Sequence, residues 1–293
     1  MKLIKKEYNP ATKHTVYRFA GIKLSIKDEK EFLRRHVKQL EKVIRVSSDI
    51  TKYPPAEGEL RKHQLKCSIL LEIFNQICKK HNLSYWIDSG TLLGAYRHKG
   101  FIPWDDDVDV CMLRDDYNKI LKILYEELEN TEFTLRERAF KTNNFQIRIY
   151  NKFARKVALD IFPVDKFNRS NLTDLEKQEI TKDIKFATEF FHNKYNVETM
   201  DACEIAIAKS DIANIQNEYI LKNQICKCEK PALFFAIDFP CDALGNLILD
   251  YDTVFPLKEI EFEGKLYPCP NNNKDYLGNY YGNFMEFPEN FKF

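Results

Sequence analysis

Four aspartates lie within five positions of the sequence, at 105, 106, 107 and 109, and apolar residues flank them on both sides. The flanks, Phe-Ile-Pro-Trp before and Val-Cys-Met-Leu after, are typical of a buried strand and not of a solvated acidic run. If a strand begins near Asp107, then Asp107 and Asp109 project from the same face. Two carboxylates this close repel each other, and a divalent cation removes that penalty. The spacing therefore predicts a metal site.

The ligand types indicate which metal this site would hold. Carboxylate oxygens without a neighbouring His or Cys pair favour Mg²⁺ or Mn²⁺ over zinc. Proteins commonly hold Mg²⁺ with one or two carboxylates together with substrate phosphates, so the cluster indicates phosphoryl chemistry. A calcium-binding loop is the alternative, but Val110 and Asp116 stand where such a loop needs Gly and usually Glu.

A glycine turn and a basic segment upstream of the aspartates are suited to holding phosphate. The turn follows a predicted strand at 85–88, opens a short helix, and consists of Ser89, Gly90 and Thr91. Its backbone N–H groups could cradle an anion. Arg97 and Lys99 add cations between this turn and the acidic cluster. Each feature alone is typical of an ordinary turn or a solvated patch, but their order along the chain predicts a metal–phosphate site.

The segment 89–110 closely resembles the signature of the LicD family of phosphotransferases, and a predicted β-hairpin at 254–268 extends the resemblance. Fukutin-type proteins of animals share the pattern, and the family is similar to the nucleotidyltransferase fold of DNA polymerase β. The resemblance implies an α+β fold with a nucleotidyltransferase-like mixed sheet flanked by helices. Asp107 and Asp109 correspond to the first two metal ligands, although the stretch from Gly90 to Asp107 is longer than that superfamily usually has.

Asp160 is the predicted third ligand. It is the single charge in the apolar segment 157–163, predicted as a strand that ends at its proline, and such a carboxylate is costly unless it is paired or binds a cation. The family carries a second acid after this element, which corresponds to Asp165 and is interpreted as a structural turn residue. Arg148, in a predicted strand at 146–150, is of the right type for a phosphate clamp, and a surface salt bridge explains it equally well.

The resemblance also implies a reaction. A hydroxyl of a cell-surface glycan, such as a lipopolysaccharide or teichoic acid precursor, attacks the phosphorus that bears the alcohol in a CDP-linked donor, most simply CDP-choline, and cytidine monophosphate leaves. Asp107 and Asp109 hold one or two Mg²⁺ ions, while Asp160 completes the site and accepts the hydroxyl proton. Arg97 and Lys99 offset negative charge on phosphate oxygens. The expected partners are a CDP-linked alcohol and a glycan or glycolipid acceptor.

Two other functions remain open at this point. A nucleotidyltransferase that takes a nucleoside triphosphate would use the same metal ligands. A non-catalytic scaffold of a glycan-assembly complex would retain the fold without the reaction. The identity of the transferred alcohol is open as well, because aromatic residues that could cage choline are abundant throughout the chain.

The proline- and glycine-containing segment at 54–58 predicts a boundary between an N-terminal appendage at 1–58 and a second part at 59–293. The resemblance implies that 59–293 is a LicD-like catalytic domain with a variable helical insert at about 168–250. The appendage combines a predicted hairpin with a basic amphipathic helix at about 28–47. Peripheral attachment to anionic lipid and ordinary packing are both compatible with that helix. A second amphipathic helix, at about 60–81, opens the catalytic domain.

Composition limits the function classes further. The 293 residues carry a net charge of +1, which indicates no bulk attraction to nucleic acid. No run of 18 apolar residues and no apolar signal core is present, so we expect a cytoplasmic protein whose membrane contact is at most peripheral. Cysteines 67, 78 and 111 are expected to be reduced core thiols. Zinc is an open alternative, with spacing that fits poorly, for Cys203, Cys226, Cys228 and Cys241.

Overall fold

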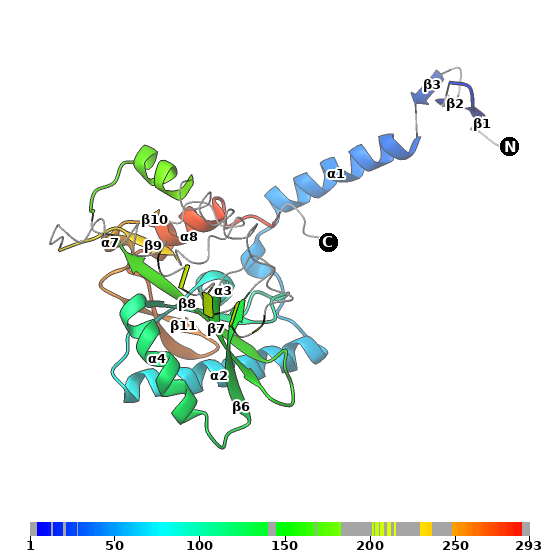
Figure 1. The fold of residues 1–293 in the computed structure, drawn as a ribbon. Helices are drawn as coiled ribbons and strands as arrows, with labels where there is room; N and C mark the ends of the chain where they lie inside the picture. The colour runs from blue at the N-terminus through cyan, green and yellow to red at the C-terminus, as the bar shows by residue number, and fades with distance from the viewer. Residues whose placement is uncertain are drawn as a thin grey trace. The chain divides into compact units, whose positions relative to one another are not determined.

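The computed structural model divides the chain into two compact units, Met1–Lys52 with Met285–Phe293, and Tyr53–Phe284 (Figure 1). The residues that it describes are 5–12, 14–19, 22–27, 29–139, 145–167, 169–182, 229–235, 248–288 and eight positions between 201 and 214. Most of the predicted helical insert lies outside these residues, apart from a helix at 174–182. Three of the four cysteines considered for zinc, Cys226, Cys228 and Cys241, also lie outside them.

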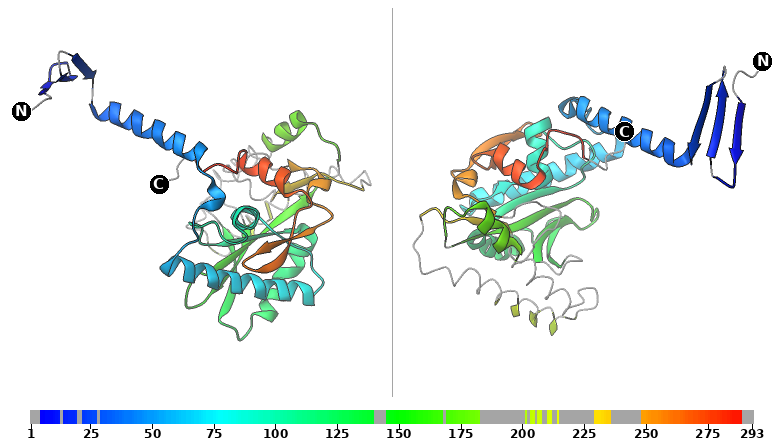
Figure 2. Two further views of the ribbon diagram at one scale, coloured as in Figure 1. Left: turned by 180° about the vertical axis from the view of Figure 1, so that it is seen from behind. Right: turned by 90° about the horizontal axis from the view of Figure 1, so that it is seen from above.

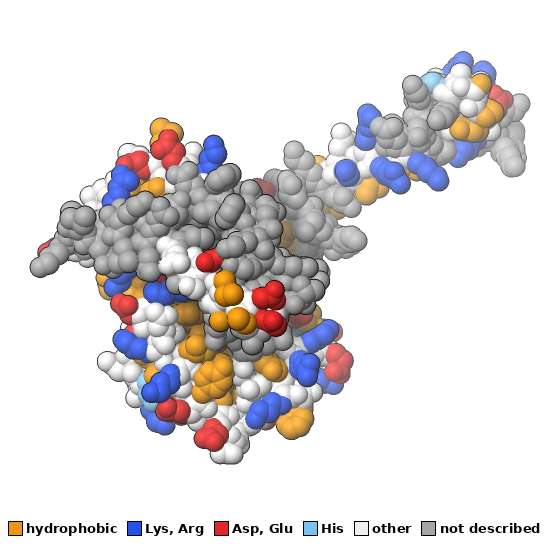
Figure 3. Space-filling model, viewed as in Figure 1, with side chains coloured by type: hydrophobic (Ala, Val, Ile, Leu, Met, Phe, Trp, Pro, Cys, Tyr) orange, Lys and Arg blue, Asp and Glu red, His pale blue; other side chains and the backbone are white. Residues whose placement is uncertain are grey.

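The N-terminal unit consists of a small antiparallel sheet followed by a helix. The sheet contains β1 (Lys5–Asn9), β2 (His14–Phe19) and β3 (Ile22–Lys27), side by side in that order (Figure 2). The predicted hairpin is confirmed as β2–β3, whereas β1 was not predicted. The predicted helix is α1 (Glu29–Ser47), and Lys and Arg side chains line it in Figure 3. A short 3₁₀ turn, η1 (Ile50–Lys52), follows α1.

The unit Tyr53–Phe284 is built on a seven-stranded mixed sheet. Its strands are β4 (Trp86–Ile87), β5 (Val108–Leu113), β6 (Phe133–Ala139), β7 (Phe145–Asn151), β8 (Ala158–Lys166), β9 (Leu233–Phe235) and β10 (Ile248–Leu249). β8 is central and pairs in parallel with β5. Its other edge pairs antiparallel with β7 along the first half and with β9 along the second half. β4, β6 and β10 are antiparallel to β5, β7 and β9 respectively.

β8 does not end at Pro163, as the sequence predicted, but continues to Lys166. The pairing with β7 reaches Ile161, and the pairing with β9 begins at Val164. Pro163 therefore lies at the junction between the two neighbours, where its missing N–H leaves no ladder partner unsatisfied.

Helices cover this sheet. They are α2 (Gly58–Lys80), α3 (Ser89–His98), α4 (Arg114–Glu127), α7 (Tyr251–Val254) and α8 (Asn273–Tyr281). α2 and α4 both contact β5 and β8, and both are seen below β8 in Figure 1. The buried residues of α2 recur with helical spacing, among them Cys67, Leu70, Leu71, Phe74, Ile77 and Cys78. The hydrophobic periodicity that predicted α2 thus marks the face that packs on the sheet.

A β-hairpin near the C-terminus lies beside the sheet. Its strands β11 (Lys258–Phe262) and β12 (Lys265–Cys269) are joined by Glu263 and Gly264, which both have positive φ, 50° and 75°. Positive φ at both turn residues is the geometry of a two-residue type I′ hairpin. β11 contacts α3 and β12 contacts β4, so the turn lies near the end of α3.

The predicted fold class is confirmed, because the structure is a mixed α+β fold with a central sheet flanked by helices. No helix among the described residues is long and apolar enough to cross a membrane. The core gathers on β5, β8 and α2, where Val108, Val110, Leu159, Ile161 and Phe74 are fully buried. This core fixes the two strands that carry the candidate ligands.

We expect Phe74→Ala to lower the free energy of unfolding by about 3–5 kcal/mol, because it leaves a cavity between α2 and the sheet. The matched control is Ile69→Ala on the same helix, whose side chain is 57% exposed and whose loss should cost less than about 1 kcal/mol. Urea unfolding followed by tryptophan fluorescence measures both, since Trp86 and Trp104 lie in this unit. Equal effects of the two substitutions would contradict the packing described.

Candidate functional site

Three carboxylates meet where β5 and β8 begin. Asp107 precedes β5, Asp109 lies within β5, and Asp160 lies in β8 as the register partner of Asp109. One oxygen from each lies within 4.8 Å of the others. Parallel pairing of two otherwise apolar strands is therefore what brings the three predicted ligands together. A second group, Asp105, Asp106 and Asp107, satisfies the same distance and shares Asp107 with the first.

Burial and mutual repulsion raise the pKa values of these carboxyl groups. Burial, followed by the charges of Asp107 and Asp160, raises the pKa of Asp109 well above its ordinary value. Burial and the charge of Asp160 also raise the pKa of Asp107. Burial and the charge of Asp107 raise the pKa of Asp105 to about 7. Each negative charge here is held at a cost that a cation between the carboxylates would remove.

Arg148 is the one cation directly bonded to this cluster in the described part of the chain. It lies on β7 opposite Asp160 and donates through Nε and Nη2 to both carboxylate oxygens of Asp160. Arg148 thus forms a salt bridge, as one of the two sequence alternatives proposed, but a largely buried one and not one at the surface, since the side chains of Arg148 and Asp160 are only 19% and 4% exposed. The charge of the guanidinium opposes the rise in the pKa of Asp107 and thereby offsets part of the repulsion. A phosphate-clamping role for Arg148 stays a prediction.

The predicted glycine turn begins α3 beside the carboxylates. Ser89 has a positive φ of 48°, and Asp88 stands at the N-cap position. The missing side chain of Gly90 lets the carboxylate of Asp105 lie against the start of α3, since a Cβ there would stand too close to Oδ2 of Asp105. The hydroxyl oxygen of Thr91 accepts a 2.8 Å hydrogen bond from the backbone N–H of Asp109. The start of α3 is thus joined to the strand that carries Asp109.

The two predicted phosphate-binding cations, Arg97 and Lys99, lie at the far end of α3 from the glycine turn. Arg97 is buried and donates through Nη1 to the carbonyl oxygen of Phe284 at 2.8 Å, and its burial lowers its pKa to about 10. Lys99 is 76% exposed and lies 3.6 Å from Glu261. It follows the last residue of α3, roughly 15 Å along the helix axis from Ser89. The structure therefore does not bring Lys99 to the carboxylates, because one helix separates the two ends of the predicted motif.

The sequence suggested that Asp165 is a turn residue, and the structure corrects this. Asp165 lies within β8, is 1% exposed, and accepts two 2.7 Å hydrogen bonds from the guanidinium of Arg114. Arg114 begins α4, so this ion pair joins that helix to the central strand. Asp165 is structural, as predicted, but through a different contact.

Sequence reasoning missed two residues beside the site. Asp88 is fully buried and accepts hydrogen bonds from the thiol of Cys111 and the hydroxyl of Ser89, and burial raises its pKa. It ends an apolar segment, so the reasoning that identified Asp160 could have found it. His63 on α2 lies 2.6 Å from the carbonyl oxygen of Asp106, a contact between residues 43 positions apart that no local pattern indicates.

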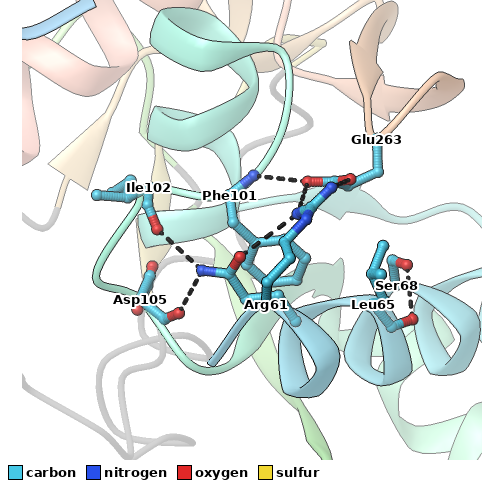
Figure 4. A network of polar contacts seen from close by, with 8 residues as sticks. Arg61, Leu65, Ser68, Phe101, Ile102, Asp105 and Glu263 are labelled. Atoms are coloured by element: carbon cyan, nitrogen blue, oxygen red, sulfur yellow. Dashed lines mark hydrogen bonds and ion pairs between the residues drawn. The ribbon is translucent and has the colours of Figure 1, made fainter. Parts of the chain in front are cut away.

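Three side chains hold the loop between α3 and β5, and we call Arg61, Gln64 and Glu263 the loop clamp. Gln64 donates through Nε2 to the carbonyl oxygens of Ile102 and Asp105, at 3.3 and 2.9 Å. Glu263, at the hairpin turn, accepts from the backbone N–H of Phe101 at 3.1 Å (Figure 4). Arg61 binds both oxygens of Glu263 at 2.8 and 2.7 Å. The clamp thus fixes the loop that delivers the aspartates to the sheet.

Comparisons with known proteins relate the chain to one protein family and to named relatives. Residues 82–203 match the family model described as LicD/FKTN/FKRP, nucleotidyltransferase domain. The chain is 29% identical over 253 residues to the lipopolysaccharide cholinephosphotransferase LicD of Haemophilus influenzae, which covers 78% of this chain and 92% of that protein. It is 34% identical over 58 residues to the ribitol-5-phosphate transferase FKTN of Mus musculus, 20% of this chain and 13% of that protein.

Residues 82–203 are thus similar to the nucleotidyltransferase domain of that family, and the named relatives are phosphotransferases. The resemblance to the LicD family that residues 89–110 indicated is thereby confirmed, and with it the expected enzyme class, a phosphotransferase. The site residues themselves, Asp107, Asp109 and Asp160, keep the status of predictions that the geometry supports.

Asp109→Asn should stabilise the metal-free protein by about 1–3 kcal/mol at pH 8, because it removes one of three repelling charges with little change of shape. The pKa of Asp109 is raised by folding, so the native state binds more protons than the unfolded state and loses stability as pH rises. The gain should therefore shrink as pH falls through the raised pKa. Thermal unfolding in EDTA, with the exposed Asp115→Asn as control, measures it; an equal or lower stability of Asp109→Asn would contradict it.

The loop clamp predicts strong coupling between Arg61 and Glu263. A double-mutant cycle with Arg61→Gln and Glu263→Gln should give a coupling free energy of about 1–3 kcal/mol, since the pair is bidentate and partly buried. The matched pair on the same helix, Glu59 and Lys62, is exposed and should show no measurable coupling. Urea unfolding of the seven proteins, the unchanged chain and three variants for each pair, measures both cycles, and equal coupling in the two would refute the clamp.

Proposed function

We propose that this chain transfers a phospho-alcohol, phosphocholine in the simplest case, from a CDP-linked donor to a hydroxyl of a cell-surface glycan or lipopolysaccharide precursor. The observation that carries the proposal is the group Asp107, Asp109 and Asp160, with oxygens within 4.8 Å, beside the start of α3. The names of the relatives, a lipopolysaccharide cholinephosphotransferase and a ribitol-5-phosphate transferase, support the phospho-alcohol and the glycan acceptor.

The donor set fits Mg²⁺ or Mn²⁺. It consists of carboxylate oxygens alone, and burial together with their mutual repulsion raises the pKa of Asp107 and Asp109. Asp160 fits as well, since a carboxylate that accepts two bonds from Arg148 retains further lone pairs. A divalent cation bound here would neutralise charge on the donor's phosphate oxygens. Asp107, Asp109 and Asp160 are the residues that would hold it.

The protein's own groups have distinct tasks in this proposal. The backbone N–H groups of Ser89, Gly90 and Thr91 begin α3, and a helix N-terminus favours phosphate. Asp160, predicted also to accept the hydroxyl proton, is poorly suited to that task because both of its oxygens already accept hydrogen bonds from Arg148. We therefore propose Asp160 as a metal ligand and Arg148 as the residue that positions it.

A reducing, cytoplasmic setting belongs to this proposal. Four cysteines of the described residues, Cys67, Cys78, Cys111 and Cys269, are buried as free thiols. Buried unpaired thiols are typical of proteins from reducing compartments, where disulfides are rare.

The test is isothermal titration of the full chain with CDP-choline, CDP-ribitol, CDP-glycerol and CTP, each with and without Mg²⁺. We expect Mg²⁺-dependent binding of one CDP-alcohol, weakened about tenfold or more in Asp107→Asn because a ligand of the metal is lost. The control is Asp115→Asn, an exposed acid at the start of α4 outside both carboxylate groups, which should bind as the unchanged chain does.

The other outcomes separate the competing functions. Tighter binding of CTP than of any CDP-alcohol would replace the proposal with nucleotidyl transfer from a triphosphate. Absence of binding across the panel would favour a scaffold. Release of cytidine monophosphate, measured by chromatography when an acceptor glycan is added, tests the reaction itself and identifies the alcohol.

A further inference from the structure

Positive charge is concentrated at the N-terminal end of this nearly neutral chain. Residues 1–52 contain 14 Lys and Arg against 6 Asp and Glu, whereas the remaining 241 residues contain 31 against 38. The two parts thus carry net charges of opposite sign, +8 and −7. Such an asymmetry indicates that the N-terminal part meets an anionic partner.

α1 exposes a continuous apolar stripe within this basic unit. Leu33, Val37, Leu40 and Ile44 are 54%, 50%, 62% and 42% exposed. Their spacing of four, three and four residues places them within roughly 60° of the helix circumference. Four exposed aliphatic side chains on one face of one helix form an apolar surface of the kind that marks interaction sites.

Basic side chains border this stripe. Lys30, Arg34 and Lys38 are exposed and follow one another along the adjoining roughly 100° of the helix surface. Figure 3 shows Lys and Arg side chains along the length of α1. A helix with a narrow apolar stripe, a basic polar face and low overall hydrophobicity is typical of helices that lie in the plane of a membrane interface.

We propose that α1 docks this protein on a membrane surface rich in anionic lipid. The stripe Leu33–Ile44 enters the boundary between headgroups and acyl chains, and Lys30, Arg34 and Lys38 meet the lipid phosphates. Docking requires neither donor nor acceptor, so the proposal stands independently of the transfer reaction.

Two other partners satisfy only part of these observations. A second copy of α1 would bury the stripe in a coiled coil, but the stripe spans fewer than two heptads, whereas stable coiled coils sustain the pattern over three or four. A nucleic acid would pair with the basic side chains through phosphates but would leave the aliphatic stripe in water. An anionic bilayer accepts both faces at once.

The test is co-sedimentation of the full chain with vesicles of phosphatidylcholine alone or with 30% phosphatidylglycerol. We expect binding to the anionic vesicles, weakened at least about tenfold in 0.5 M NaCl or in Arg34→Gln/Lys38→Gln, because each basic side chain near the surface contributes to attraction. Leu33→Gln/Leu40→Gln should weaken binding by a similar factor through the lost apolar burial. Circular dichroism checks that both variants remain helical.

The matched control is Leu65→Gln/Ile69→Gln, which changes two exposed apolar side chains on α2, 44% and 57% exposed, and should leave vesicle binding unchanged. Equal binding to vesicles without anionic lipid, no vesicle binding, or an equal loss in the α2 control would overturn the proposal. A dimer in light scattering, or binding to duplex DNA, without vesicle binding would assign α1 to a second copy or to nucleic acid instead.

Discussion

Repulsion between three carboxylates on adjacent strands is the constraint on which the rest of this structure depends. β5 and β8 pair in parallel in a register that sets Asp109 opposite Asp160, and Asp107 enters from the preceding loop. Such a group is unstable without compensation, because each ionised carboxylate raises the free energy needed to ionise its neighbour. The fold provides two forms of compensation: strands buried well enough to hold the register, and one guanidinium, that of Arg148, on the neighbouring strand.

Holding the carboxylates in place requires contacts from distant parts of the chain. The hydroxyl of Thr91 fixes the backbone of Asp109 from α3, and the loop clamp fixes the preceding loop from α2 and from the hairpin turn. Arg61 and Glu263 are 202 positions apart in sequence, yet they form an ion pair beside the nine residues that connect α3 to β5. Glu263 contacts this loop directly, because it accepts a hydrogen bond from the backbone N–H of Phe101. The late hairpin is therefore part of the support of the site, although it contributes none of the three candidate ligands.

The sequence could predict the features that depend on neighbouring residues, but not those that depend on residues far apart in the chain. Local patterns predicted α1, α2 and β5, because apolar periodicity records which face is buried, and they predicted Asp160, because a lone charge in an apolar strand demands a partner. They failed where a partner lies far along the chain: Asp165 meets Arg114, and Lys99 meets Glu261. The short strands β9 and β10, of three and two residues, carry too little pattern to predict. Pro163 wrongly indicated the end of its strand. It lies within β8, at the point where the neighbouring strand changes from β7 to β9.

The net charge of the carboxylate cluster limits how many cations it can bind. The three carboxylates with Arg148 carry a net charge of −2, which one divalent cation neutralises. A second cation would make the same group positive, unless further anionic oxygens arrived with it. In the proposed reaction those oxygens belong to the donor's diphosphate, and the nearby carboxylates of Asp105 and Asp106 are the protein groups available to share the charge. If this proposal holds, the number of metal ions would be set jointly by the protein and the donor, because among the described residues only Arg148 is bonded to the three carboxylates, and its Nε and Nη2 are already bound to Asp160.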